Sequence, residues 1–182
     1  ADAILVARAQ FSDLLMKDLD FIETRLGRDP GAAEKAVLQK LAESLMNEVP
    51  VGRAGLTAEE LKAVAAHGFC SAKPVVVAEE SDLAAPEPFL LRAFQEAGWI
   101  CFLTVGGKEN RAWPIRAGAT AAEAAGTIHT DLQKGLVRAE VISFADLVEH
   151  GGETGAKRAG KQRAELKTYV MQDYDVTNFR FN

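Results

Sequence analysis

The sequence predicts an α+β protein whose second half is a β-grasp domain and whose first half contains an antiparallel pair of helices. Apolar residues recur at helical spacing over residues 11–45, with a Gly- and Pro-containing break at residues 27–31. Residues 99–182 instead contain short β-prone runs on both sides of an Ala-rich helix. Two hairpins that embrace one helix are typical of a β-grasp domain. We therefore divide the chain into residues 1–98 and residues 99–182.

The first half opens on a short apolar run and then changes to a helical period. Residues 3–7 predict a buried strand. Ser12 is the expected N-cap of the first helix. This helix ends at residues 27–31, because glycine suits a helix end and proline prevents continuation. A second helix over residues 33–45 follows, so the two amphipathic helices are expected to form a hairpin.

The rest of the first half consists of shorter elements. Thr57 and Glu60 form the outline of a capping box, which predicts a third helix that extends to about Ala66. Residues 74–78 (PVVVA) predict a second buried strand. A Pro-rich break at residues 84–88 separates this strand from a last helix, predicted over residues 89–97 and ended by Gly98.

The second half is predicted as short strands and helices. The first elements are a hairpin of residues 99–105 and 110–115 around a turn at Gly106–Lys108, then a helix at 120–125 and a strand at 136–142. They are followed by a helical turn at 144–150, a polar helix or loop at 156–164, and a closing strand pair of 169–172 and 177–181 around a turn at Asp173–Asp175. Thr120 is the expected helix cap, with Glu123 three residues on. Val137, Ala139 and Val141 alternate with charged residues, so we expect them to face the core.

The composition is that of a globular protein. Hydrophobic residues make up 48% of the 182 residues and charged residues 26%, which excludes global disorder. The formal net charge of -5 argues against wholesale binding of nucleic acid or membrane. No apolar run reaches the ~18 residues of a membrane span, and no signal peptide is visible. We therefore expect a cytoplasmic protein that has no membrane partner.

The charge is uneven between the two halves. Residues 1–98 carry 10 Lys and Arg against 16 Asp and Glu, whereas residues 99–182 carry 11 against 10. A polyanionic partner is therefore expected to prefer the second half. Cys70 and Cys101 belong to no CxxC pair, so the sequence predicts no metal site and two thiols in a reducing compartment.

The run from Gly155 to Lys161 matches the GxxxxGK pattern of a phosphate-binding loop. It continues with Gln162, where such a loop needs a hydroxyl for Mg²⁺, and no apolar strand precedes it. We therefore interpret the run as a solvated basic helix. Its cations are candidates for contact with RNA phosphates, and they are Lys157, Arg158, Lys161 and Arg163.

Two other sets of residues have chemistry worth testing. His129 and Asp131 lie two positions apart, but without a second carboxylate or a nucleophile they predict a structural or interface role, not catalysis. Trp113 follows Arg111 within a predicted strand. We expect Trp113 to pack in the core, with base stacking on an exposed face as the alternative.

Several segments of the second half resemble the YchF / Obg-like ATPase family, in the family's order. They are Glu109–Trp113 (ENRAW) with Pro114–Arg116, Ala124–Asp131 (AAGTIHTD), Lys134–Ser143 (KGLVRAEVIS), Ala156–Lys161, Tyr169–Asp173 and Phe179–Asn182. The resemblance covers most of residues 99–182 and implies the family's TGS domain, which is a β-grasp module. It also marks Arg111, Trp113, His129, Asp131, Lys134 and Arg138 as motif residues whose role is unknown.

The first half resembles the family less closely. Residues 1–5 look like a strand of the family's nucleotide domain, residues 18–26 like its inserted helical hairpin, and residues 71–75 like the strand that re-enters the nucleotide domain. The family's Asn-x-x-Glu base-reading motif would follow, but the stretch Ala78–Asp82 contains no Asn. The first half is thus expected to be a helical hairpin with remnant strands of a P-loop α/β domain. Because a buried strand is predicted so near Ala1, we expect a longer parent or a lost segment.

Three functional hypotheses remain open, and the resemblance implies the first two. The first is a non-catalytic binding module that contacts RNA or the ribosome, with no catalytic or nucleotide-binding residue and no cofactor of its own. The second is a fragment of a competent NTPase, whose intact parent would bind ATP or GTP with Mg²⁺ through an upstream loop. The third is a homo-oligomeric interaction protein. In each case the helical hairpin is a possible contact for a protein partner.

Overall fold

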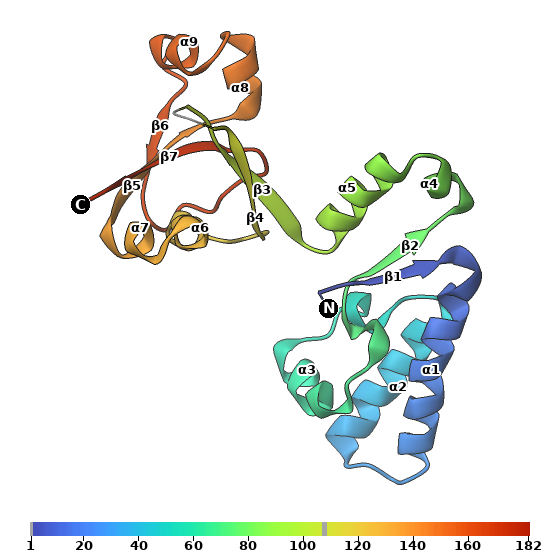
Figure 1. Cartoon of the computed structure of the whole chain (residues 1–182). Coiled ribbons are helices and arrows are strands. Elements are labelled where there is room, and N and C mark those ends of the chain that lie inside the picture. The colour runs from blue at the N-terminus through green and yellow to red at the C-terminus, as the bar shows by residue number, and fades with distance from the viewer. Residues whose placement is uncertain (1, 107–108) are drawn as a thin grey trace. The chain divides into compact units, whose positions relative to one another are not determined.

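The computed structural model describes residues 2–106 and 109–182. The chain divides into two compact units, Ala1–Ala97 and Gly98–Asn182, which we call unit 1 and unit 2 (Figure 1). Ala1, and the predicted turn residues Gly107 and Lys108, lie outside the described residues. Among the helices described, none has both the length and the apolar character needed to cross a bilayer.

Unit 1 contains a two-stranded parallel sheet. β1 (Ile4–Ala7) pairs with β2 (Val75–Ala78). Val75 and Val76 are buried, as predicted for β2, but the Leu5 side chain is 58% exposed. The prediction of a buried strand is therefore wrong for alternate residues of β1. The reason is that the core of unit 1 lies on one side of β1 only. Val6 packs against this core, and Leu5, the residue before it in the strand, lies on the opposite side.

Two long helices form most of the core of unit 1. α1 (Arg8–Leu26) and α2 (Ala32–Met46) lie side by side and run in opposite directions (Figure 1). The Gly- and Pro-containing break separates them as predicted, but α1 already begins at Arg8, so Ser12 lies inside the helix and is not its cap. The buried apolar residues of this core are Phe11, Leu15, Ile22, Val37, Leu38, Leu41, Leu45, Val51, Val64, Phe69 and Val75.

A buried aspartate attaches the segment after α2 to α1. This segment consists of η1 (Val51–Arg53), α3 (Ala58–Val64), η2 (Ala65–His67) and η3 (Cys70–Ala72). The Asp18 carboxylate accepts hydrogen bonds from the backbone N–H groups of Cys70 and Ser71 at 2.8 and 2.7 Å. These bonds offset the desolvation of a side chain that is only 3% exposed. The predicted capping box of Thr57 and Glu60 is confirmed.

Two helices follow β2, namely α4 (Glu80–Ala84) and α5 (Pro86–Glu96). The predicted break at residues 84–88 is wrong in length, because α5 begins at Pro86, where the missing N–H of proline costs no helical hydrogen bond. The Arg92 guanidinium donates to the Val77 carbonyl oxygen and to the Asp82 carboxylate. These bonds attach α5 to β2 and α4.

Unit 2 is built on a five-stranded sheet in the order β4-β3-β7-β5-β6 (Figure 1). Its strands are β3 (Trp99–Thr104), β4 (Arg111–Arg116), β5 (Leu136–Ile142), β6 (Arg163–Glu165) and β7 (Val176–Phe181). β7 lies at the centre, parallel to β3 and antiparallel to β5. The sheet is therefore mixed, and its last strand joins two segments that are distant in sequence.

The predicted strand at residues 169–172 is wrong. Only Val170 forms a bridge, with Thr120. The Asp175 carboxylate accepts hydrogen bonds from the Tyr169 hydroxyl at 2.8 Å and from the Gln172 N–H at 2.9 Å. Because this carboxylate holds both ends of the segment, the chain turns there and pairs only from Val176 onward.

One face of the sheet packs against α6 (Ala121–Ile128), whose predicted Thr120–Glu123 capping box is confirmed. The short helix α7 (Thr130–Gly135), which the sequence did not predict, follows directly. The buried core residues here are Phe102, Ile115, Ala121, Ala124, Ala125, Leu136, Ala139, Val141, Met171 and Phe179.

The predicted alternation in β5 is wrong at Val137. Ala139 and Val141 are fully buried, but Val137 is 48% exposed. The pairing register shifts between Leu136 and Arg138, so Val137 lies in a bulge and Leu136 takes the core position.

The remaining elements of unit 2 are α8 (Phe144–Glu149), as predicted, and α9 (Glu153–Arg158). The predicted polar helix or loop at residues 156–164 is therefore only partly correct, since its last residues belong to β6. A small apolar cluster of Ile142, Ala156 and Val176 holds α9 against the sheet.

Candidate nucleic-acid interface

Two of the four predicted phosphate-binding cations have carboxylate partners in α8 and α9. The Lys157 ammonium lies 2.6 Å from the Glu153 carboxylate, one helical turn earlier in α9. The Lys161 ammonium lies 3.0 Å from the Asp146 carboxylate of α8. This hydrogen bond raises the pKa of Lys161 above its ordinary value. Both lysines are cationic, but a phosphate would have to compete with a carboxylate for each.

Arg163 is exposed but is bound by side chains of neighbouring segments. Its guanidinium donates to Glu165 at 3.0 Å and to the Tyr169 hydroxyl at 3.2 Å, and lies 3.8 Å from the buried Asp175. Burial lowers the pKa of Arg163. The hydrogen bonds to Glu165 and Tyr169 raise it by more, so the pKa of Arg163 is raised overall. Arg163 therefore supports the turn before β7, and the prediction that all four cations share one solvated helix is wrong.

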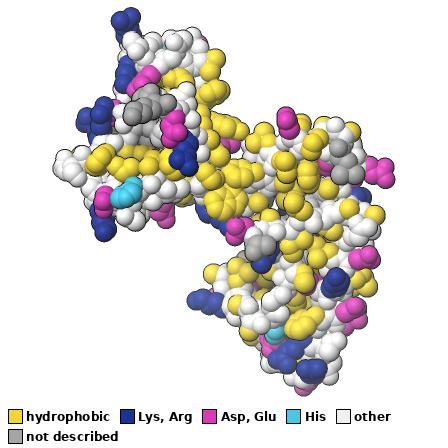
Figure 2. All heavy atoms as spheres, in the orientation of Figure 1, with side chains coloured by type: hydrophobic (Ala, Val, Ile, Leu, Met, Phe, Trp, Pro, Cys, Tyr) yellow, Lys and Arg dark blue, Asp and Glu magenta, His cyan; other side chains and the backbone are white. Residues whose placement is uncertain are grey.

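Arg158 differs from these three residues. It is exposed in the last turn of α9 and, within the part of the chain that the structure describes, forms no ion pair. Figure 2 shows Lys and Arg side chains exposed over unit 2, including at its α9 end. Of the predicted set, Arg158 is the cation most available to a phosphate.

The GxxxxGK run is a helix and a turn. Residues Glu153–Arg158 form α9, where a phosphate-binding loop would have open backbone. A Cβ at Gly155 would lie 1.8 Å from the His150 carbonyl oxygen, so this glycine permits close packing of α9 on the end of α8. Gly160 has a φ of +71° and ends the helix. Both glycines thus have structural causes, and Lys161 points to Asp146.

Two arginines of β4 stack on tryptophan rings. The guanidinium carbons of Arg111 and Arg116 lie 4.2 Å from the ring centroids of Trp113 and Trp99, respectively. Trp113 also stacks on Phe102 and donates through Nε1 to the Thr104 hydroxyl at 3.0 Å. Trp113 is therefore a half-buried core residue covered by Arg111, not an open platform for a base.

His129 and Asp131 form a helix cap. The Asp131 N–H donates to His129 Nδ1 at 3.1 Å at the start of α7. Their side chains are 65% and 77% exposed, which gives neither residue the desolvated setting of an acid–base pair. At the other end of α7, Lys134 is exposed and has no carboxylate partner within the described residues.

Glu140 is a polar centre that sequence reasoning missed. Its carboxylate accepts from Arg180 and from Gln162, each at 3.0 Å, and lies 3.6 Å from Arg138. The bond to Arg180 is the largest cause of the lowered pKa of Glu140. Arg138 and Arg180 are directly opposite in β5 and β7, so this single carboxylate offsets their repulsion. Only the pairing of the strands brings these residues together.

Among the described residues, one group of potential metal ligands lies in α8 and at its end. Ligand atoms of Asp146, Glu149 and His150 lie within 4.8 Å of one another. The Asp146 carboxylate is already bound by the Ser143 hydroxyl and the Lys161 ammonium. A metal ion would therefore have to compete with the Lys161 ammonium for the Asp146 carboxylate.

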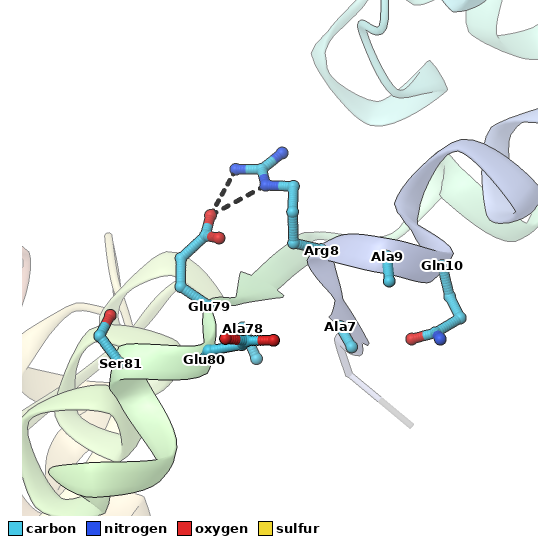
Figure 3. Close-up of a pocket in the computed structure, with 8 residues that line it drawn as sticks. All are labelled: Ala7, Arg8, Ala9, Gln10, Ala78, Glu79, Glu80 and Ser81. Carbon is cyan, nitrogen blue, oxygen red and sulfur yellow. Dashed lines mark hydrogen bonds and ion pairs between the residues drawn. The ribbon is translucent and has the colours of Figure 1, made fainter.

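A cavity of about 650 Å³ lies in unit 1 at the carboxyl ends of β1 and β2 (Figure 3). The Arg8 guanidinium donates to the Glu79 carboxylate across it, at 2.9 and 2.6 Å. The charged residues of the lining are Arg8, Glu79 and Glu80. Because carboxylates outnumber cations and one of them holds the arginine, the lining does not fit the phosphates of the ATP or GTP that the family resemblance implies.

Comparison with known proteins shows which family the second half of the chain matches and which proteins the chain is similar to. Residues 99–182 match the family YchF-GTPase_C, described as a protein of unknown function (DUF933). The chain is 34% identical over 234 aligned positions to the "Ribosome-binding ATPase YchF" of Haemophilus influenzae, which covers 94% of this chain and 64% of that protein. Residues 99–182 are thus a YchF-GTPase_C region, and the chain as a whole is similar to YchF and Obg-like ATPases.

Other relatives match a shorter stretch of the chain at higher identity. The "Ribosome-binding ATPase YchF" of Escherichia coli O157:H7 is 58% identical over 81 residues, which are 44% of this chain and 22% of that protein. "Obg-like ATPase 1" of Oryza sativa subsp. indica is 45% identical over 104 residues, which are 57% of this chain and 26% of that protein. The chain thus spans less than two thirds of the length of these relatives.

A solved structure shares the fold. The Schizosaccharomyces pombe YchF GTPase superposes with a TM-score of 0.69 at 20% identity, covering 98% of this chain and 71% of that chain. At this identity the likeness shows the fold alone. It includes both units, whereas the family match covers only residues 99–182.

Proposed function

We propose that this chain is a ribosome- or RNA-binding module that acts without hydrolysing a nucleotide, and that unit 2 carries the contact. The observation that carries the proposal is the 58% identity over 81 residues to a protein named a ribosome-binding ATPase, together with the family match of residues 99–182. Unit 2 also lacks the acidic excess of the first half, which would repel the phosphates of RNA.

The topology of unit 2 supports its interpretation as a TGS-type β-grasp domain. The sheet order places the last strand, β7, between the first and third strands, with the parallel pairing to β3. The helix α6 follows β4 and precedes β5 in the chain, and it packs on one face of the sheet. The parallel pairing of β3 with β7 and the helix on one face support the interpretation, although β7 pairs with β5 and not with residues 169–172.

The cations without carboxylate partners are the best candidates for phosphate contact. In the described part of unit 2 they include Lys134, Arg158 and Lys167, all of them exposed. Each can exchange a counterion for a phosphate without breaking an ion pair, whereas Lys157, Lys161 and Arg163 cannot.

Cosedimentation tests this function. The full chain is centrifuged with purified ribosomes at about 50 to 200 mM salt, without nucleotide. We expect it in the ribosomal pellet at the lowest salt, with a bound fraction that falls as salt rises. A chain that stays in the supernatant at every salt concentration contradicts the proposal.

Calorimetry tests the independence from nucleotide. Phosphoryl transfer requires a cradle of backbone N–H groups, a lysine and a hydroxyl that binds Mg²⁺, and the GxxxxGK run offers a helix and Gln162 instead. Titration with ATP or GTP and Mg²⁺ is therefore expected to show no saturable binding. Micromolar affinity for either nucleotide would instead favour the competent NTPase.

A further inference from the structure

A groove on unit 1 lies between α1 and the end of α2, far in sequence from the cations discussed above. It has a volume of about 280 Å³. Its lining consists of Ser12, Leu15, Met16 and Leu19 from α1, Leu45 and Met46 from the end of α2, and Glu48 just after α2. Small-molecule pockets measure roughly 300–1,000 Å³, so the groove suits a few side chains of a partner better than a drug-sized ligand.

The groove has a fixed floor and adaptable walls. Leu15 and Leu45 are 3% and 4% exposed and belong to the core, so they form a rigid base. Met16 and Met46 are 50% and 67% exposed. Methionine is flexible and polarizable, and exposed methionines are typical of surfaces that bind apolar helix faces.

The surroundings of the groove are acidic. Asp13 and Asp20 lie one helical turn to either side of Met16, Glu43 lies one turn before Met46, and all three are exposed. Glu48 lines the groove itself and lies just after α2 with a φ of +59°, a conformation in which glycine is commonest.

Few cations balance this acidity. Arg8 is bound to Glu79, and Lys17 is the exposed lysine next to Met16 in the sequence. A second copy of the chain would bring the same acidic face, and like charges opposed in this way disfavour self-association.

We propose that this groove binds a basic amphipathic helix of a protein partner. The apolar side chains of that helix, spaced one turn apart, enter between Met16 and Met46, and its flanking Lys and Arg face the acidic rim. The interaction is separate from the contact proposed for unit 2.

A designed peptide tests the proposal on the full chain. The probe is a fluorescent peptide of about 18 residues, longer than the ~12–15 that an isolated helix needs, with Leu on one face and Lys on the other. One control peptide has Glu in place of every Lys, and a second has the same composition in scrambled order. Fluorescence anisotropy is expected to show saturable binding of the basic amphipathic peptide alone, weakened by added salt.

Two variants separate the groove from general charge attraction. Met16→Glu with Met46→Glu is expected to weaken binding by at least about tenfold, because it places charge where the apolar anchors bind. Leu61→Glu changes an equally exposed apolar residue on α3 and is expected to leave binding unchanged. If circular dichroism shows that the Glu variant does not fold, Met16→Gln with Met46→Gln replaces it, with a reduced affinity again expected.

The proposal would be overturned if the basic peptide did not bind, if the scrambled peptide bound equally well, or if the methionine variants bound the peptide like the unchanged chain. A dimer in solution that the methionine variants dissociate would make a second copy of this chain the occupant.

Discussion

The Lys161 ammonium lies 3.0 Å from the Asp146 carboxylate, so a cation that the sequence offers to phosphate is bound to α8. The Ser143 hydroxyl and then Lys161 hold the pKa of Asp146 below its ordinary value. A phosphate can recruit Lys161 only by breaking this pair. The basic segment is thus divided into cations that hold unit 2 together and cations that remain available.

Replacing Lys161 therefore tests stability more than binding. Lys161→Gln removes the ion pair to Asp146 and is expected to lower the thermal midpoint of unfolding slightly, because α9 loses a link to α8. Cosedimentation with ribosomes is expected to stay the same. A loss of ribosome binding as large as that of Arg158→Gln would show that Lys161 leaves Asp146 to contact phosphate.

Asp175→Ala is expected to destabilise unit 2 by about 1–3 kcal/mol. The carboxylate is 3% exposed and accepts from the Tyr169 hydroxyl and the Gln172 N–H, so its removal leaves two partly buried donors without their acceptor. Urea unfolding of the full chain gives the change in free energy. Asp131→Ala, at a 77% exposed side chain, is the matched control and should cost much less.

Acid is expected to weaken unit 1 through Glu34. The hydrogen bond from Arg25 is the largest cause that lowers the pKa of Glu34, with a further bond from His67. A carboxyl group with a lower pKa in the folded state stabilises the fold above its unfolded pKa of about 4.3, and this contribution is lost as pH falls through the folded value.

The variant Glu34→Gln isolates this contribution. It is expected to be less stable at neutral pH and to show a smaller loss of stability on acidification than the unchanged chain. The measurement is urea unfolding at several values from about pH 3 to about pH 7. Equal pH dependence of the stability in both proteins would mean that the bonds of Glu34 to Arg25 and His67 do not contribute to the free energy of unfolding.

Residues 99–182 are expected to fold alone. The core around Phe102 and the small cluster around Val176 are both formed from residues of unit 2. The isolated segment should therefore give one cooperative unfolding transition in urea. A gradual, non-cooperative change would show that unit 1 contributes to its core.

Local signals in the sequence predicted much of the fold. The capping boxes at Thr57 and Thr120 are confirmed because each is completed within one helical turn. The break between α1 and α2 follows from glycine and proline in the same way. The turn at Asp173–Asp175 was predicted, but the bulge at Val137 and the lack of a strand at residues 169–172 were not, because both depend on strands or side chains that pair across the unit.

The candidate interface was harder to predict. Spacing in the sequence put Lys157, Arg158, Lys161 and Arg163 together as one basic run. Their partners, Asp146 for Lys161 and Asp175 for Arg163, come from α8 and from the turn before β7. Glu140 and Arg180 are 40 positions apart and meet only because β7 pairs with β5.

The most direct test of the account is the salt dependence of ribosome cosedimentation for Lys134→Gln with Arg158→Gln. Each lost phosphate contact lowers the slope of log affinity against log salt by roughly one unit or slightly less. We expect weaker binding and a shallower slope for this double variant, and no change for the control Lys17→Gln with Lys62→Gln in unit 1. Equal binding and equal slope for both double variants would contradict the claim that the available cations of unit 2 contact the ribosome.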